Sequence, residues 1–281
     1  MEKVIGFSQC TSEEPWRVNQ NNEMQAAARR HPELKLEIAH GENQNDKQIA
    51  DVGALVMKGV NVLIVSPREA GPLTGPVDKA FDLGIPVIVL DRKVRGKKFT
   101  SFIGASNWDI GRAAGQYLAE TLKPPAKIWE IEGVLGATAT KDRHGGFREA
   151  LAEHQGLEVV YEQIGDFLRL PAKQKMENAL RAFPKIDAVF AHNDEMAIGA
   201  FLAAKALGRE KQMVIVGIDG QGEAVKMVRA GELAATFIYP NGASEAIETS
   251  VKILKGETVP KEITLETTRI TRDEHMEYKG F

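Results

Sequence analysis

The sequence predicts an α/β protein made of two doubly wound lobes, each a parallel sheet covered by helices. Its 281 residues suit two domains of ordinary size. Short apolar runs alternate with segments of helical spacing, which is typical of parallel strands connected by helices. The same alternation occurs twice along the chain, so we expect two similar lobes rather than one large sheet.

The predicted strands form two groups of four. In the first half they cover residues 4–8, 35–39, 62–66 and 86–90. In the second half they cover residues 127–132, 158–162, 188–191 and 214–218. "NVLIVSPREAG" with "IPVIVLDR" matches "DAVFAHNDEMAIG" with "QMVIVGIDG", so Asp91 and Asp219 end corresponding strands.

Two helices between these strands are expected to bury one face each. The first is marked by Ile49, Val52, Val56 and Val60. The second is marked by Met176, Leu180 and Phe183. In doubly wound sheets ligands bind beyond the carboxyl ends of the strands, near the point where strand order reverses. The residues that follow each strand are therefore the candidates for a site.

Charge and apolar patterning exclude several classes of protein. The formal net charge is −3 with both signs mixed, whereas a nucleic-acid-binding protein is expected to have a basic face. No apolar stretch approaches the roughly 20 residues that span a bilayer. Met1-Glu2-Lys3 leads directly into an apolar strand without the features of a secretory leader, so we expect either a cytosolic protein or a mature form.

Cys10 is the only cysteine. No internal disulfide and no thiolate metal site can form with one cysteine. A small buried residue at the end of a strand is the favoured interpretation, since free cysteines are often buried. A nucleophile is disfavoured because no histidine-based activating motif accompanies it.

Polar and aromatic residues follow two strands of the first half. "SQCTSEEPWR" places Trp16 and Arg17 at the start of a helix that begins with a proline. Trp16 either packs locally or offers a flat apolar surface to a sugar ring. "VIVLDR" places Asp91, which accepts hydrogen bonds, beside Arg92, which donates through a planar fork. The alternative is that Asp91 only caps the following turn.

The second half has a comparable set. Arg143 is expected at the entrance of a helix, where a cation is unfavourable and a binding role is favoured. Phe167 follows a strand, where an aromatic side chain suits a ligand. Asn193 and Asp194 precede a helix, and either can be its N-cap. Asp219 is followed by a glycine that allows close backbone approach. Aromatic rings with arginines, carboxylates and an amide suit a neutral polyhydroxylated ring.

Over nearly its whole length the chain resembles the sugar-binding proteins of bacterial ABC importers, of the ribose-binding type. The most specific pieces are "VLDR", "DRHGGF" and "AHNDEMAIGA", in that order and spacing, followed by "IDG". "GFSQ", "PWR" and "EIEGVLGATATKDR" are most similar to the galactofuranose-binding branch. The resemblance implies a type I periplasmic binding protein fold and a non-catalytic receptor for one monosaccharide. It also implies permease subunits as partners, a monomer, and a periplasmic location after removal of a signal peptide.

The resemblance also implies roles for individual residues. Trp16 and Phe167 would lie on the two faces of the sugar ring. The hydroxyls would be bound by Asp91, Arg92, Arg143, Asn193 and Asp219. Arg17 would be an additional contact, as in the galactofuranose-binding branch.

Two motifs depart from close relatives. The ribose-binding type carries a polar residue, often glutamine, before a proline in the last crossing strand, where "ATFIYPN" has Ile238 and Tyr239. Either Tyr239 binds the hydroxyl concerned or the ligand lacks it, so we expect galactofuranose or another aldose rather than ribose. "GENQNDKQ" lacks the alternating oxygen ligands of the calcium loop in galactose/glucose-binding relatives. We expect no metal and no cofactor.

Three crossings between the lobes are implied, near residues 105–107, 237–240 and 267–269. The N-terminal lobe would comprise residues 1–105 and 240–267, and the C-terminal lobe residues 106–239 and 268–281. Lobes joined by a three-segment hinge can close as rigid bodies around a ligand. A ligand that lacks one hydroxyl then leaves a buried polar group unpaired, at a cost of about 1–3 kcal/mol.

Two other functions fit the sequence less well. An enzyme is disfavoured because GxSxG, GxxxxGK[ST] and HExxH motifs are missing, although Asp91 and Asp219 invite comparison with a glycosidase pair. His144 and His192 are expected to pack or cap rather than catalyse. The alternative function is the effector-binding core of a sugar-responsive transcription regulator. It is disfavoured because the first strand begins near residue 3 and leaves no room for a helix-turn-helix module.

Overall fold

Two compact units make up the structure, a computed structural model that describes residues 3–281. The first unit contains Met1–Ala105, described from Lys3, with Gly136–Thr138 and Pro240–Glu266. The second contains Ser106–Leu135, Ala139–Tyr239 and Thr267–Phe281. Met1 and Glu2, which enter the expectation about a leader, lie outside the described residues.

The first unit is a doubly wound parallel sheet with the strand order β11-β5-β4-β3-β1-β2. Its strands are β1 (Lys3–Gln9), β2 (Leu34–His40), β3 (Val62–Ser66), β4 (Val87–Leu90), β5 (Ser101–Ala105) and β11 (Glu262–Leu265). β1 pairs in parallel with β2 on one side and with β3 on the other. The strand order therefore reverses between β1 and β3, and the connections after these strands leave toward opposite faces.

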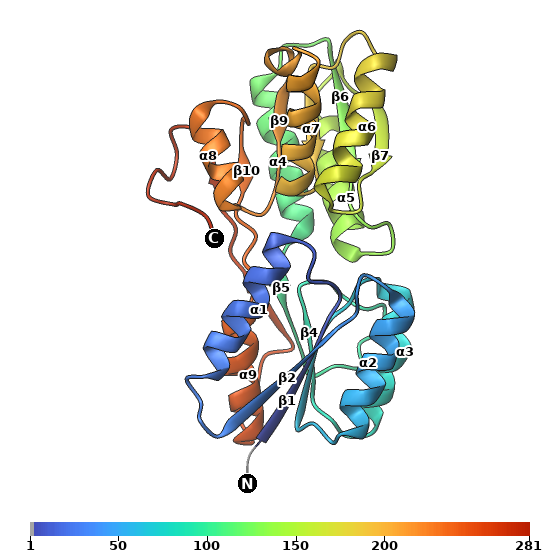
Figure 1. Ribbon diagram of the computed structural model, residues 1–281, viewed down its shortest axis with the longest axis vertical. Coiled ribbons are helices and arrows are strands. Elements are labelled where there is room, and N and C mark those ends of the chain that lie inside the picture. The colour runs from blue at the N-terminus through green and yellow to red at the C-terminus, as the bar shows by residue number, and fades with distance from the viewer. Residues whose placement is uncertain (1–2) are drawn as a thin grey trace. The chain divides into compact units, whose positions relative to one another are not determined.

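Helices cover both faces of this sheet, as Figure 1 shows. They are α1 (Pro15–Ala28), α2 (Asn45–Met57), α3 (Ala70–Asp82) and α9 (Ala243–Leu254). Side chains alternate along β3, so Ile64 packs in the core beneath α1 and α9 while Leu63 and Val65 pack beneath α2 and α3. Burial on both faces explains why these strands are continuously apolar.

The second unit repeats this topology with the strand order β7-β6-β8-β9. Its parallel strands are β6 (Ala126–Glu132), β7 (Leu157–Ile164), β8 (Ala188–Ala191) and β9 (Val214–Val216). They correspond in order to β1, β2, β3 and β4, and the reversal lies between β6 and β8. The predicted repeat and the predicted fold class are confirmed.

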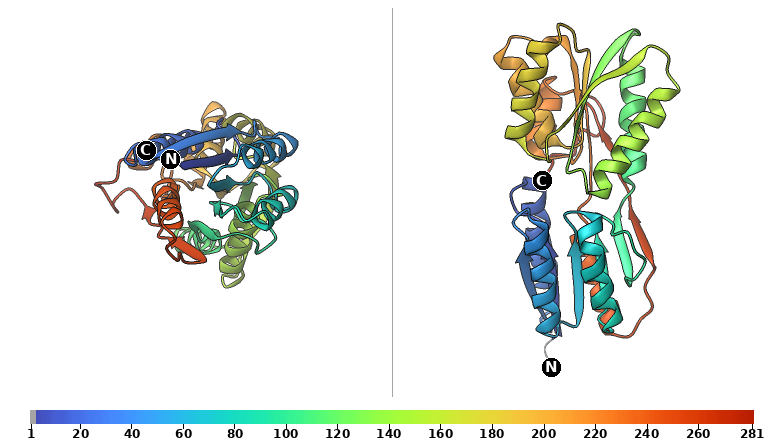
Figure 2. Two further views of the ribbon diagram at one scale, coloured as in Figure 1. Left: turned by 90° about the horizontal axis from the view of Figure 1, so that it is seen from below. Right: turned by 90° about the vertical axis from the view of Figure 1, so that its right-hand side faces the viewer.

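Helices again lie on both faces of the second sheet. They are α4 (Asn107–Thr121), α5 (Thr138–Ala152), α6 (Arg169–Ala182), α7 (Asp194–Ala206) and α8 (Gly222–Ala230), with a short 3₁₀ helix, η1 (Glu210–Gln212). The right-hand view of Figure 2 shows α4 and α5 on one face and α6 and α7 on the other. The core includes the stacked rings of Phe147 and Phe190, whose centroids are 4.3 Å apart. Two short strands, β10 (Thr236–Phe237) and β12 (Arg269–Ile270), pair antiparallel beside this sheet.

Some predicted boundaries differ from the structure. α2 ends at Met57, because Gly59 adopts a left-handed φ of +74°, so Val60 is buried outside the helix. Phe183 is the C-cap of α6 rather than a member of its face. β9 ends at Val216, since Gly217 N donates to Ala235 O and the chain leaves the sheet. Gly136–Thr138 belongs to the first unit, although the sequence assigned it to the second; Gly136 O accepts from Ala70 N there.

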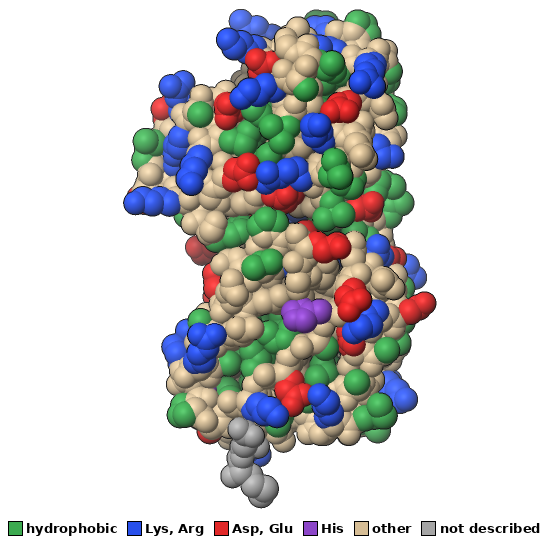
Figure 3. Space-filling model, in the orientation of Figure 1, with side chains coloured by type: hydrophobic (Ala, Val, Ile, Leu, Met, Phe, Trp, Pro, Cys, Tyr) green, Lys and Arg blue, Asp and Glu red, His purple; other side chains and the backbone are tan. Residues whose placement is uncertain are grey.

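The described helices suggest no membrane span, and the face drawn in Figure 3 is not strongly charged. Among residues 3–281 no helix is long and apolar enough to cross a bilayer. On the face drawn in Figure 3, acidic and basic side chains are interspersed rather than gathered by sign.

Candidate functional site

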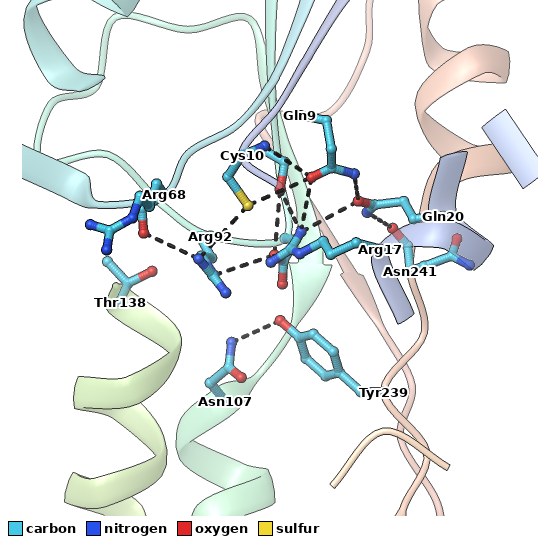
Figure 4. A network of polar contacts seen from close by, with 12 residues as sticks. Gln9, Cys10, Arg17, Gln20, Arg68, Arg92, Asn107, Thr138, Tyr239 and Asn241 are labelled. Atoms are coloured by element: carbon cyan, nitrogen blue, oxygen red, sulfur yellow. Dashed lines mark hydrogen bonds and ion pairs between the residues drawn. The ribbon is translucent and has the colours of Figure 1, made fainter. Parts of the chain in front are cut away.

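In the first unit, polar side chains gather at the carboxyl edge of the sheet, beside the point where strand order reverses. Gln9 ends β1, Ser66 ends β3 and Asp91 follows β4. Arg17 and Gln20 reach this edge from α1, which begins six residues after β1. We call these five residues, together with Trp16 and Arg92, the first cluster; Figure 4 shows most of its contacts.

Arg17 is the centre of the first cluster. Its Nη2 donates to Asp91 Oδ2 at 2.6 Å, and its Nη1 donates to Ser66 Oγ at 2.8 Å. Both side chains of the Arg17–Asp91 pair are 2% exposed. Burial opposes the charged form of Arg17, but the charge and hydrogen bond of Asp91, together with the charges of Cys10 and Glu14, outweigh it, so the pKa of Arg17 is raised. Arg17 Nε is buried without a hydrogen-bond partner among the described residues.

Glutamine side chains complete the environment of Arg17. Gln9 Nε2 donates to Gln20 Oε1 at 2.8 Å and to Asn21 Oδ1 at 3.0 Å. Gln20 Nε2 in turn donates to Asn241 O at 2.7 Å, which ties α1 to the start of the segment leading to α9. These amides fix α1 against the sheet edge and limit the positions that Arg17 can take.

Asp91 and Arg92 follow β4 in a strained turn. Asp91 has a φ of +68°, a left-handed conformation that costs free energy for a residue other than glycine. Arg92 Nη1 donates to Arg68 O at 3.1 Å and lies 3.9 Å from Cys10 Sγ. Cys10 is free and 1% exposed, in agreement with the expected small buried residue. Asp91 is thus more than a turn cap, because its carboxylate accepts from Arg17.

Trp16 lies at the start of a helix, as the sequence predicted, and its side chain is buried. It lies in the first turn of α1 after Pro15 and is 4% exposed. The Arg17 guanidinium carbon is 4.6 Å from the centroid of its ring, a cation–π distance. The ring is therefore held beside the cationic centre of the first cluster.

In the second unit, Arg143 is the corresponding centre. Its Nε donates to Asn107 Oδ1 at 2.8 Å, and its Nη1 donates to His192 O, which follows β8. Asn107 Nδ2 donates to Tyr239 Oη at 3.0 Å. The Arg143 guanidinium carbon lies 4.5 Å from the centroid of the Tyr239 ring. Arg143 lies in the second turn of α5, not at its entrance, so the predicted conflict with the helix dipole does not arise.

Asn193 and Phe167 are linked by a hydrogen bond from the Asn193 side chain to the Phe167 backbone carbonyl. Asn193 is the N-cap of α7, since its Oδ1 accepts from Met196 N at 3.0 Å. Its Nδ2 donates to Phe167 O at 3.0 Å. Phe167 has a φ of +65° and is 3% exposed. Its ring lies on Gly133, where an added Cβ would stand 2.0 Å from the ring, so only glycine fits.

Asp219 lies in the connection after β9. Its φ is +136°, and its N donates to Phe237 O at 2.8 Å. Its carbonyl accepts from Tyr239 N at 3.1 Å, so Asp219 and Tyr239 are fixed to each other through the backbone. Asp194 is not an N-cap. It is fully buried and accepts from Thr236 Oγ1 at 2.7 Å and from Gln221 N at 2.9 Å. We call Asn107, Arg143, Phe167, Asn193, Asp219 and Tyr239 the second cluster.

A buried carboxylate adjoins the second cluster. Glu130 on β6 is fully buried and meets His144 Nδ1 at 3.1 Å and His192 Nε2 at 3.0 Å. Burial alone raises the pKa of a carboxyl, but the hydrogen bonds to both imidazoles outweigh it and lower the pKa of Glu130 to about 2. The bond to Glu130 raises the pKa of His144, whereas burial lowers that of His192. Both histidines therefore pack and orient, as the sequence suggested.

Four polar contributors were missed in the sequence: Gln9, Gln20, Ser66 and Asn107. Gln9 and Ser66 carried a usable signal, because each is the last residue of its strand. Asn107 begins α4 directly after Ser106, so helix capping is the ordinary interpretation of that pair. Gln20 lies inside a helix and is polar like its neighbours, so no local pattern marks it.

The groups of the two clusters are suited to hydrogen bonding and to contact with the faces of a ring. A carboxylate held by an arginine accepts hydrogen bonds well and is poorly suited to donate a proton. Within residues 3–281 no group of three or more His, Cys, Asp or Glu side chains is placed to hold a metal ion. Planar cations, amides, carboxylates and aromatic rings are the groups that bind a polyhydroxylated ring.

Comparisons with known proteins also indicate a binding protein. Residues 5–258 match the sequence profile described as "Periplasmic binding protein domain". The chain is 35% identical to the ribose import binding protein of Bacillus subtilis strain 168, over 94% of this chain and 85% of that one. It is 32% identical to the galactofuranose-binding protein of Escherichia coli K12, over 98% of this chain and 91% of that one. A solved fructose-binding periplasmic domain of a hybrid two-component system has a TM-score of 0.94 at 39% identity, covering 97% of this chain and 92% of that one.

Proposed function

The chain belongs to the periplasmic binding protein family, a family of solute receptors, and from that premise we propose that it captures one monosaccharide and delivers it to an ABC importer. Relatives named as import binding proteins for ribose, and as binding proteins for galactofuranose and fructose, support the ligand class. They do not favour the transcription-regulator alternative. In this function the chain catalyses no reaction and works in the periplasm with permease subunits as partners.

One observation carries the ligand class: each unit has at its sheet edge a buried arginine next to an aromatic ring and to oxygen acceptors. Arg17 lies over Trp16 at 4.6 Å, and Arg143 lies over Tyr239 at 4.5 Å. Sugar rings present apolar C–H faces and hydroxyl edges, which such pairs of groups can bind together.

In this proposal both clusters bind the same sugar. Hydroxyls are bound by Arg17, Asp91, Arg92, Arg143, Asn193, Asp219 and Tyr239, and the ring lies against Trp16 and Phe167. The chain passes between the units five times, and the passages at Ala105/Ser106, Tyr239/Pro240 and Glu266/Thr267 serve as the hinge; the other two flank Gly136–Thr138. Arg17 with Tyr239 favours galactofuranose or another aldose over ribose, because both residues depart from the ribose-binding pattern.

A thermal-shift screen tests the proposal. The protein is heated with galactofuranose, galactopyranose, fructose, arabinose, ribose and myo-inositol, and with an amino-acid and a nucleotide panel as controls. A ligand that binds only the folded state raises Tm, by an amount set by its concentration relative to Kd. We expect one or two sugars to raise Tm and the control panels to leave it unchanged. Stabilisation by amino acids or nucleotides alone would refute the proposal.

A further inference from the structure

The backbone groups of Asp219 and of the two residues after it are held by several hydrogen bonds. Besides the two bonds to β10 and Tyr239, Gly220 N donates to Thr236 Oγ1 at 3.1 Å and Gln221 N donates to Asp194 Oδ2 at 2.9 Å. These bonds come from α7 and from residues 236–239. They leave the Gly220 carbonyl and the Gly222 amide to be satisfied from elsewhere.

Residues 271–281, which we call the C-terminal segment, supply both partners. Tyr278 Oη donates to Gly220 O at 3.0 Å, and Phe281 O accepts from Gly222 N at 3.2 Å. Contact is close along this line, because a Cβ at Gly280 would stand 2.4 Å from Gly222 Cα. Gly280 also has a φ of +83°, so a side chain there is excluded for two reasons.

The other end of the C-terminal segment is anchored by Arg229 near the end of α8. Its guanidinium donates to the carbonyls of Thr271, Arg272, Glu274 and His275. α8 starts at Gly222, so one helix holds the segment at both of its ends. The segment is therefore a docked element rather than a loose extension.

The conformation of Asp219 explains why this docking matters. A φ of +136° is rarely adopted by a residue with a side chain, and such strain persists only where the surroundings over-determine it. We propose that the C-terminal segment is part of the ligand-binding apparatus and that Tyr278 is a positioning residue, which fixes the Asp219 carboxylate through the Gly220 carbonyl. The inference rests on the proposed function, in which Asp219 binds a sugar hydroxyl.

A double-mutant cycle separates positioning from general stability. Tyr278→Phe keeps the ring and removes one hydrogen bond, so we expect sugar affinity to fall about three- to tenfold. In the Asp219→Ala background the same change should have no further effect, since the group that it positions is gone. Gly280→Ala, which displaces the segment without shortening it, should behave in the same way. Equal affinity of Tyr278→Phe and the unmodified protein, or additive losses in the cycle, would overturn the inference.

Tyr117→Phe is the matched control. Tyr117 Oη donates to Ala234 O at 3.2 Å, so its loss removes the same kind of bond in the same unit. We expect it to lower Tm without lowering affinity. Amide hydrogen exchange gives a readout that needs no ligand: Tyr278→Phe should speed exchange at residues 219–222, and Tyr117→Phe should not. A protein that binds no sugar would thus refute the proposed function, whereas unchanged exchange would refute the positioning role.

Discussion

In the first unit the buried arginine is paired with a carboxylate, Arg17 with Asp91 at 2.6 Å, whereas in the second unit Arg143 donates to neutral acceptors, Asn107 Oδ1 and the His192 carbonyl. Among the described residues no carboxylate forms an ion pair with Arg143. The second unit does bury a carboxylate, Glu130, but it pairs with two imidazoles and with the half-exposed Arg148 rather than with Arg143.

This difference separates stability from binding. Removing one member of a buried ion pair leaves an uncompensated charge, which is strongly destabilising. Removing an arginine that has only neutral partners leaves unsatisfied acceptors but no isolated charge. The first cluster should therefore be costly to mutate for folding as well as for binding, and the second cluster mainly for binding.

The largest effect is expected for Asp91→Ala. Arg17 and Arg92 would remain buried without their shared carboxylate, so the free energy of unfolding of the ligand-free protein should fall by about 3 kcal/mol. Sugar binding should be lost as well. Urea denaturation measures the first effect and calorimetric titration the second. Asp91→Asn, which keeps the shape and removes the charge, should behave similarly. A denaturation curve that superimposes on that of the unmodified protein would contradict the comparison.

Arg143→Met should affect sugar affinity more than it affects the free energy of unfolding. Each lost hydrogen bond to a charged donor is worth about 1.5–3 kcal/mol, so affinity should fall at least tenfold to a hundredfold. The free energy of unfolding should fall by only about 1–2 kcal/mol, because two neutral acceptors lose their donor. Arg112→Met, on the exposed part of α4, is the control and should leave affinity unchanged. A larger stability loss than that of Asp91→Ala would break the contrast between the units.

The third prediction concerns the pH dependence of stability. Because Glu130 lies in the second unit, we expect the stability of this unit to depend on pH. The folded-state pKa of Glu130 is lowered to about 2. The ionised Glu130 side chain therefore adds its full contribution to the free energy of unfolding at pH values above the unfolded pKa near 4.5, and this contribution is lost as pH falls toward 2. That contribution is about 3 kcal/mol for a shift of this size. The raised pKa of His144 adds stability that is lost as pH rises through it. Glu130→Gln should flatten the dependence of the free energy of unfolding on pH, and Glu149→Gln should not. If the two variants lose stability identically at low pH, Glu130 is not the group responsible.

The smallest effect is expected for Ser66→Ala. The change removes the bond that Ser66 Oγ accepts from Arg17 Nη1 and the long bond of 3.4 Å that it donates to Asp91 Oδ2, which should lower affinity about three- to tenfold and stability by about 1 kcal/mol. Ser8→Ala is a matched control, because Ser8 Oγ is equally buried near the end of the neighbouring strand and has no hydrogen-bond partner in the described structure. We expect Ser8→Ala to be neutral or slightly stabilising. If titration shows the same loss of sugar affinity in both variants, the binding role of Arg17 does not depend on its hydrogen bond to Ser66.

Several elements were predictable because their signals are local. Strand β3 was predicted with its observed bounds, since an apolar run of four residues that ends at Ser66, between turn residues, has few alternatives. Asp91 and Asp219 were matched by the internal repeat, and both adopt positive φ values after corresponding strands. Arg143 was misplaced relative to its helix because "GATAT" contains several residues that can cap a helix, Gly136, Thr138 and Thr140, so the local sequence does not mark where α5 begins. Asp194 was taken for an N-cap because a carboxylate before a helix is usually one.

By itself the sequence determined the two-lobed α/β fold and the positions where polar residues follow strands, because hydrophobic periodicity and strand ends are properties of neighbouring residues. Only the tertiary structure decided which of these residues are partners. Arg17 meets Asp91 across 74 positions, and Tyr278 meets Gly220 across 58. Pairs this far apart are brought together by sheet order and helix packing, which leave no trace in local spacing.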